Sequence, residues 1–264
     1  MPTVQAVIDS IIAGIRGAPF EKTVDSIKVG DADAEVRGIL TTFLATDRLL
    51  HFAVEHDLNL IVTHEPTFYH HFDELERYRE SEVLRSKLAF AEEHNLVIWR
   101  CHDYAHRHDP DVIVEGVVEA LRWEKYREQT RDYPLFELTH RPRPSALANE
   151  IKSALGTSRV LVAGDPDAAC RRVALLVGAQ GGERQIEAAI RHDVDALVAG
   201  EINEWEVAEY FRDAAFQKRG TALLVVGHQP SEEAGMARLA KMIEARFPEI
   251  PVIHRAAGDP LRVV

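Results

Sequence analysis

The chain has 264 residues, of which 46% are hydrophobic and 28% are charged, as in ordinary globular proteins. Its formal net charge of −12 argues against general nucleic-acid binding, because phosphate binding relies on clustered lysine and arginine. No apolar run approaches the roughly 18 residues that span a bilayer, and the N-terminus lacks a signal-peptide pattern. We therefore expect a cytoplasmic protein that is not held in a membrane.

Apolar residues at helical spacing open the chain, and short apolar runs then alternate with amphipathic stretches. The apolar runs predict strands over 36–43, 58–63, 96–101, 160–163, 173–178, 196–199 and 222–227. The amphipathic stretches predict helices over 47–56, 81–94, 111–122, 145–155, 183–192, 204–212 and 232–246. This alternation predicts an α/β fold whose mostly parallel sheets are flanked by helices.

The two halves of the chain also resemble each other. Residues 46–65 match residues 182–201 with identities that include a shared His-Asp pair, and residues 96–102 match residues 222–228. Two ordinary βαβ units could show some of this likeness, but the shared pair favours an internal duplication. We expect two similar lobes, residues 1–130 with the first metal ligands and residues 131–264 with the last ones, which together form one two-lobed domain.

Three of the predicted strands run directly into histidines. His64 and Glu65 follow the strand 58–63, and His102 and His106 follow the strand 96–101. The strand 222–227 leads to His228, with Glu232 four positions later. Functional groups collect beyond the carboxyl ends of parallel strands, and imidazole with carboxylate suits Zn, Mn, Fe or Co. A single histidine at a strand end is usually a surface residue, but three such ends in one chain favour a pair of metal ions, which either glutamate could bridge.

Several neighbouring residues have more than one interpretation. Asp103 is either a ligand or the carboxylate that orients a ligating imidazole. Cys101 should point away from His102 into the core, because side chains alternate along a strand. The glycines before the helix 183–192 lack the GxGxxG spacing, so they predict a turn rather than a nucleotide fingerprint. Three further histidines belong either to the loop surface or to the surroundings of the site: His70, His71 and His108.

Two motifs in the sequence resemble those of a known protein family. One is a strand that runs into Thr63-His64-Glu65-Pro66, and the other is Gly227-His228 with Glu232 four residues further on. Together they resemble the Nif-three-like dinuclear metal-centre family, whose members are catalogued as GTP cyclohydrolase 1 type 2 homologs. The resemblance covers nearly the whole chain, and it includes a glycine turn over residues 178–182.

The resemblance implies a ligand set and also shows where this chain departs from its pattern. It implies that two divalent transition-metal ions are bound by His64, Glu65, His102, His106, His228 and Glu232, with His102 either a ligand or an orienting neighbour. Glu65 stands where the family has a second histidine, and His106 stands where it has an aspartate.

The resemblance also implies a homohexameric ring with its sites facing inward. The function that follows is a metal-dependent hydrolase for a small polar or nucleotide-like substrate, with a metal-bound hydroxide as nucleophile. The alternative is a non-catalytic metal-binding ring with a regulatory or structural role. A catalytic site would keep a coordination position open for water, whereas a structural site would be closed by protein ligands.

Overall fold

The computed structural model describes residues 1–130 and 133–264, and it divides the chain into two compact units. The first unit comprises Met1–Gly116 and Gly235–Ala257, and the second comprises Val117–Ala234 and Gly258–Val264. Two of the three changeovers fall within helices, α5 Val112–Leu121 and α9 His228–Arg246, and the third follows Ala257. Residue 131, where the second lobe is expected to begin, lies outside the described residues.

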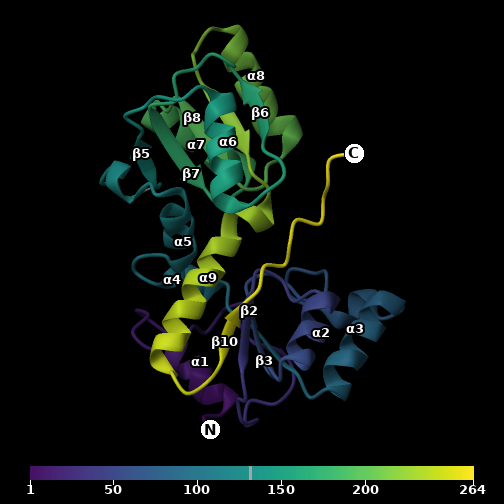
Figure 1. Cartoon of the computed structure of the whole chain (residues 1–264). Coiled ribbons are helices and arrows are strands. Elements are labelled where there is room, and N and C mark those ends of the chain that lie inside the picture. Colours follow the sequence, from purple (N-terminus) through teal and green to yellow (C-terminus); the bar gives the residue numbers. More distant parts are fainter. Residues whose placement is uncertain (131–132) are drawn as a thin grey trace. The chain divides into compact units, whose positions relative to one another are not determined.

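The sheet of the first unit has five strands in the order β1-β4-β3-β2-β10. β10, β2, β3 and β4 are parallel, and β1 pairs antiparallel with β4 at the edge. The strands are β1 Ile27–Val29, β2 Ile39–Thr42, β3 Leu60–Thr63, β4 Val97–Arg100 and β10 Val252–His254. The helices of this part are α1 Val4–Ile12, α2 Asp47–Glu55, η1 Leu75–Tyr78, α3 Glu82–Glu93 and α4 Asp103–Arg107. In Figure 1, α2 and α3 lie side by side, and the two helices contact each other.

The sheet of the second unit also has five strands, in the order β5-β7-β8-β9-β6. β7, β8 and β9 are parallel, and the two edge strands are antiparallel to their neighbours. The strands are β5 Leu135–Glu137, β6 Leu161–Gly164, β7 Arg172–Leu176, β8 Ala196–Ala199 and β9 Ala222–Val225. The accompanying helices are η2 Glu124–Tyr126, α6 Pro144–Leu155, α7 Gly182–His192, η3 Glu204–Ala208 and α8 Glu209–Phe216. Two more helices, α5 and α9, each contain one of the changeovers between the units.

The central strands are buried and mostly apolar because both faces of each sheet are covered. All four residues of β3, β4 and β8 are buried, which accounts for the continuous hydrophobic runs in the sequence. Each sheet contains three consecutive parallel strands joined by helices, β2-β3-β4 in one unit and β7-β8-β9 in the other. The α/β class and the two similar lobes are thus as expected from the sequence.

The His-Asp pair shared by the two halves is a helix-ending device. His56 follows α2 and His192 is the last residue of α7, and each precedes an aspartate with a positive φ, Asp57 at 54° and Asp193 at 47°. Aspartate tolerates this left-handed conformation better than most residues do, and the conformation commonly terminates a helix. The shared His-Asp pair therefore reflects how the two helices end, and it does not mark a functional site.

All seven predicted strands are present, but the sequence prediction missed β1, β5 and β10. Each of these has only three residues and mixes polar with apolar side chains, so it gives no clear period. The prediction also missed α4, and α9 begins at His228 rather than at residue 232. Pro230 is compatible with that earlier start, because proline is tolerated in the first turn of a helix. Within the described ranges, no helix is long and apolar enough to cross a bilayer.

Candidate metal centre

A buried carboxylate fixes the turn that carries His102. This turn joins β4 to α4, and Asp25 accepts hydrogen bonds from the backbone N–H groups of His102 (2.7 Å), Asp103 (3.1 Å) and Tyr104 (2.8 Å). The side chain thus satisfies donors that the start of a helix leaves open. Burial raises the pKa of Asp25, although these hydrogen bonds oppose that effect. His102 is the N-cap of α4, and its carbonyl accepts from the N–H of His106 at 3.1 Å, so the two imidazoles lie one helical turn apart on the same side.

His64 enters the same region from the end of β3. Its side chain is fully buried, and its backbone N–H donates to the carbonyl of Phe43 at 3.1 Å. Arg100, also fully buried, donates from Nε to the carbonyl of His64 at 3.1 Å and from Nη1 to the carbonyl of His71. The guanidinium therefore holds the loop after β3 at two points, and this fixes the direction of the His64 side chain.

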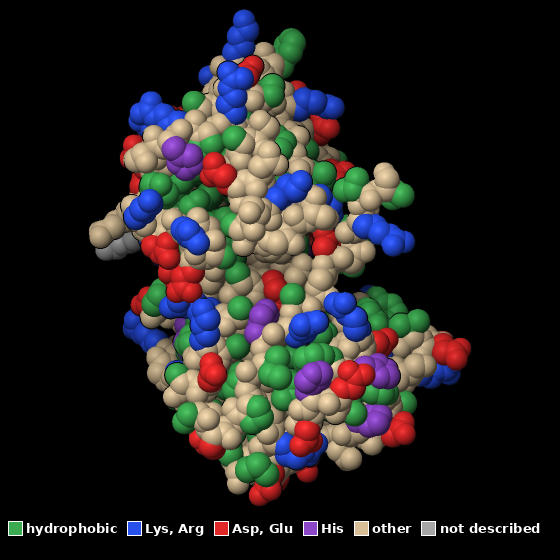
Figure 2. Space-filling model, viewed as in Figure 1, with side chains coloured by type: hydrophobic (Ala, Val, Ile, Leu, Met, Phe, Trp, Pro, Cys, Tyr) green, Lys and Arg blue, Asp and Glu red, His purple; other side chains and the backbone are tan. Residues whose placement is uncertain are grey.

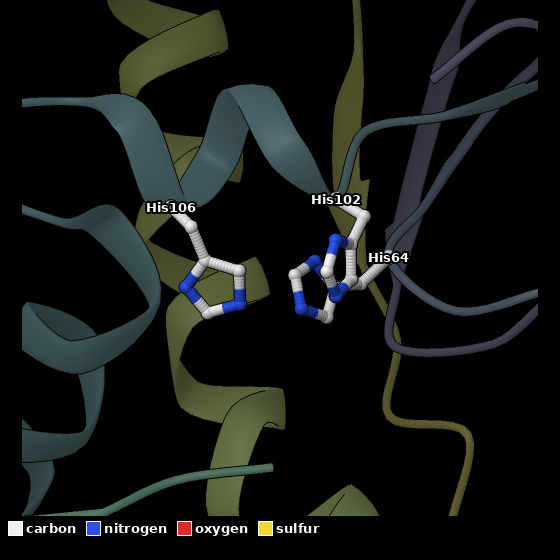
Figure 3. Close-up of side chains that lie close together, drawn as sticks. All are labelled: His64, His102 and His106. Carbon is white, nitrogen blue, oxygen red and sulfur yellow. The ribbon is translucent and has the colours of Figure 1, made fainter. Parts of the chain in front are cut away.

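These three imidazoles form a compact cluster, which Figure 3 shows with the rings turned toward one another. One ring nitrogen from each of His64, His102 and His106 lies within 4.8 Å of the other two. The ring of His64 is stacked on that of His102, with centroids 4.7 Å apart, and the ring of His106 lies edge-on to both at 5.0 Å. Such a donor set suits a transition-metal ion, because neutral imidazole is a common ligand for Zn, Cu, Fe and Ni.

The hydrogen bonds of the rings strengthen this interpretation, since each Nδ1 has a partner on the far side from the cluster centre. Nδ1 of His64 lies 3.1 Å from the carbonyl of Cys101, and Nδ1 of His102 lies 2.9 Å from Asp103. Nδ1 of His106 lies 2.9 Å from Asp111. In metal sites the non-ligating nitrogen of a histidine usually contacts a carbonyl or carboxylate in this way. Nε2 is then the nitrogen that can bind an ion, so the residues present fit a metal.

Two carboxylates orient the imidazoles of α4. Asp103 also accepts hydrogen bonds from Oγ1 of Thr23 (2.8 Å) and the N–H of Val24 (3.2 Å), which favours the orienting alternative over the ligand alternative. Although burial opposes it, these contacts lower the pKa of Asp103. Asp111 was missed by the sequence analysis. An aspartate directly before an apolar helix is a cap signal, and its other oxygen accepts from the N–H of Ile113 at 2.8 Å.

Glu65 faces the cluster and does not turn away from it. Oε1 lies 3.7 Å from Nε2 of His102, and Oε2 lies 3.6 Å from Nη2 of Arg100. The carboxylate of Glu65 thus lies between a candidate ligand and a buried cation.

The expected core position of Cys101 is also confirmed, because that thiol is fully buried.

The second unit holds the other two predicted ligands at the start of α9. Nδ1 of His228 lies 3.0 Å from Oε2 of Glu201, and Nε2 lies 3.2 Å from Oε2 of Glu232. Glu232 is 2% exposed, and it lies against the turn at Gly178, where a Cβ would collide with its carboxylate. Glu201 was also missed by the sequence analysis, although the internal repeat contains a signal for it.

That signal is the alignment of Glu201 with Glu65. The same repeat aligns His228 with His102, so each unit pairs a glutamate with the histidine that follows its third parallel strand. Four residues after that histidine stands a second donor, His106 in the first unit and Glu232 in the second. The six predicted ligands therefore occur as two related clusters, His64-Glu65-His102-His106 and His228-Glu232.

The position of Gly178 leads to a stability prediction. Gly178 has φ 66° and Gly156 has φ 65°, but a Cβ at Gly156 would meet open space. Both Gly178→Ala and Gly156→Ala should cost about 1 kcal/mol of left-handed strain. Only Gly178→Ala must also displace the carboxylate of Glu232, so its urea midpoint should fall clearly further. Equal midpoints for the two variants would show that Glu232 does not depend on this glycine.

The burial of His102 leads to a prediction on pH. Burial and the neighbouring His64 lower the pKa of His102 from 6.5 to about 4, so the imidazole is neutral at pH 7 and suited to bind a metal. Between these two values the unfolded chain binds a proton that the native protein does not bind, so stability must fall as the pH falls. The melting temperature of metal-free protein should therefore drop between pH 6.5 and 4, and less steeply in His102→Gln. Identical pH profiles for the two proteins would contradict the lowered pKa.

Comparison with known proteins places the chain in a family. The sequence pattern of Duf34/NIF3 (NGG1p interacting factor 3) matches residues 23–258. The chain belongs to the Duf34/NIF3 family. A curated member from Clostridium acetobutylicum, named GTP cyclohydrolase 1 type 2 homolog, is 22% identical over 227 residues, which cover 83% of this chain and 80% of that protein. A protein of the same name from Clostridium perfringens is 22% identical over 268 residues, with 97% and 98% covered.

Solved structures show the same fold. A hypothetical protein from Staphylococcus aureus superposes with a TM-score of 0.76 at 16% identity, over the whole of both chains. A Bacillus cereus protein related to NIF3 gives a TM-score of 0.77 at 13% identity, covering 100% of this chain and 99% of the other. The arrangement of two five-stranded mixed sheets flanked by helices is therefore that of NIF3 proteins, and the His/Glu clusters mark a potential metal site within it.

Proposed function

We propose that this NIF3 protein binds a pair of divalent transition-metal ions and hydrolyses a small polar or nucleotide-like substrate. The proposed metals are Zn, Mn, Fe or Co, and the proposed ligands are His64, Glu65, His102, His106, His228 and Glu232. The observation that carries the proposal is the cluster of three imidazoles, each with its Nδ1 held by a carbonyl or carboxylate. A surface histidine has no need of such an arrangement.

Some of these side chains would bind the metal ions, and others hold the ligands in position. His64, His102 and His106 would supply nitrogen ligands, while Asp111 and Asp103 keep the rings of α4 in place. Glu65 would supply an anionic oxygen and at the same time offset the buried charge of Arg100. When bound, the ions would act as Lewis acids and lower the pKa of coordinated water toward neutrality, which is the chemistry that hydrolysis needs.

The test of catalysis is hydrolysis of para-nitrophenyl phosphate and bis-para-nitrophenyl phosphate by protein stripped with EDTA and then reloaded with Zn, Mn, Fe or Co. We expect activity only with metal, and we expect the doubly substituted His64→Ala/His106→Ala protein to stay inactive. Tight metal binding without turnover of either ester, or of a pool of nucleotides, would favour the alternative of a non-catalytic metal-binding assembly.

The assembly itself is a separate proposal, which rests on the resemblance of the motifs to a family of ring-forming proteins. We expect a homohexamer, so light scattering should give about six times the chain mass of 29.7 kDa. A monomer at every concentration tested would exclude the ring but would leave the proposed metal ligands unaffected. Figure 2 shows both signs of charge mixed over the face in view, which agrees with the expectation that the protein is not a general nucleic-acid binder.

A further inference from the structure

A cavity opens beside the histidine cluster within the first unit. Its volume is about 530 Å³, within the range of small-molecule binding sites. One wall is the segment from Gly17 to Lys22, and the other is α4, from which His102 and His106 reach the cavity. A molecule in this space would therefore lie next to two of the proposed metal ligands.

Two cations on the walls have no acidic partner. Lys22 comes from one wall and Arg107 from the other, and both side chains are exposed. Among residues 1–130 and 133–264, neither of them forms an ion pair. Glu21 and Asp103 are the acidic side chains among the lining residues, and the contacts of Asp103 with His102 and Thr23 hold its carboxylate, so Lys22 and Arg107 are the groups that can meet an anion.

An aromatic ring forms part of the same wall. Phe20 is stacked on Tyr104, with ring centroids 4.8 Å apart and an angle of 15° between the planes. The N–H of Phe20 donates to the hydroxyl of Tyr104 at 3.1 Å, and Tyr104 itself is buried. The ring is thus fixed in place while it borders the cavity, which makes it a flat apolar surface for a second ring.

We propose that this cavity binds a phosphate monoester of a planar ring, with the phosphate between Lys22 and Arg107 and the ring against Phe20. The guanidinium of Arg107 can donate two hydrogen bonds to phosphate oxygens, and Lys22 adds a point charge. The assignment rests on the proposed function, since it names the substrate class for the same histidine cluster. The proposed phosphate site differs from the proposed metal site because its binding groups are side chains of the protein and need no metal.

The test is calorimetric titration of the full-length, EDTA-treated protein with phenyl phosphate, inorganic phosphate and phenol. Phenyl phosphate should bind with a dissociation constant on the order of 1 mM, inorganic phosphate more weakly, and phenol least. Lys22→Gln and Arg107→Gln should each weaken phenyl phosphate about tenfold, the usual loss for a hydrogen bond to a charged group. The matched control is Lys241→Gln, which removes an exposed lysine of α9 away from the cavity wall and should leave the affinity unchanged.

Two more variants separate the ring from the phosphate. Phe20→Leu should weaken phenyl phosphate several-fold and leave inorganic phosphate unchanged, while Glu21→Gln should strengthen both because it removes an opposing charge. Failure of phenyl phosphate to bind at about 10 mM would overturn the proposal, as would equal effects of Lys22→Gln and Lys241→Gln. Because the titration contains no metal, this result is independent of whether the protein binds metal or hydrolyses esters.

Discussion

Metal binding should weaken by at least a hundredfold when His64 and His106 are both replaced by alanine. The two residues supply imidazoles to the same cluster, and loss of an orienting neighbour alone typically costs 10- to 100-fold in metal affinity. Zinc affinity measured by competition with a chromophoric chelator gives the size of the loss. The corresponding variant of the second cluster, His228→Ala/Glu232→Ala, should also lose most of its bound metal.

The control for this experiment lies in the same loop. His70 and His71 follow His64 by a few residues, but His70 lies 3.7 Å from Glu74 and neither residue belongs to the cluster. His70→Ala/His71→Ala should therefore keep the wild-type zinc affinity. If His70→Ala/His71→Ala lost as much zinc affinity as His64→Ala/His106→Ala, metal binding would depend on the loop as a whole and not on the cluster. Circular dichroism must show that the His64 variant is folded, because that residue is fully buried.

The second large effect is expected from Glu65→His, which restores the residue of the family pattern. A carboxylate favours oxygen-preferring ions such as Mn, so an imidazole here should shift the preference toward Zn or Co. The loss of one negative charge beside the coordinated water should also lower the pH optimum of any hydrolysis. The proximity of Glu65 to His102, 3.7 Å between Oε1 and Nε2, is the structural reason to expect both changes.

The same substitution should destabilise the metal-free protein. Arg100 is fully buried, and Glu65 is the acidic side chain that faces its Nη2 at 3.6 Å. Removing one partner of a buried ion pair leaves the other charge without compensation, which we expect to cost about 3 kcal/mol. Glu65→Asp, which keeps the charge, is the matched control for stability. Unchanged metal preference together with unchanged stability would show that Glu65 contributes to neither role.

The sequence predicted those parts of the molecule that depend on strong local patterns. The seven predicted strands could be found because each is a mostly apolar run. The histidines after three of them could be found because a ligand at the carboxyl end of a strand must follow that strand closely. The short strands β1, β5 and β10 could not, since pairing at a sheet edge and not their own residues makes them strands. The order of the strands within each sheet likewise depends on packing.

The supporting carboxylates were harder to find for the same reason. Asp25 lies far in sequence from the turn at His102 that it caps, and no spacing rule connects the two. Asp111 has the sequence signature of a helix cap, which explains the residue without any second role. Its contact with His106 could be seen only in the structure. Glu201 was present in the repeat as the counterpart of Glu65, but the likeness did not say which histidine it would contact.

The most direct test of metal binding at the histidine cluster is anomalous X-ray diffraction from crystals of the protein loaded with zinc or cobalt. We expect an anomalous peak about 2.0–2.1 Å from Nε2 of His64 and His106, with the Nδ1 contacts to Cys101 and Asp111 intact. Occupancy should disappear in His64→Ala/His106→Ala and persist in His70→Ala/His71→Ala. A peak bound elsewhere, or none at this cluster in protein saturated with metal, would contradict this expectation.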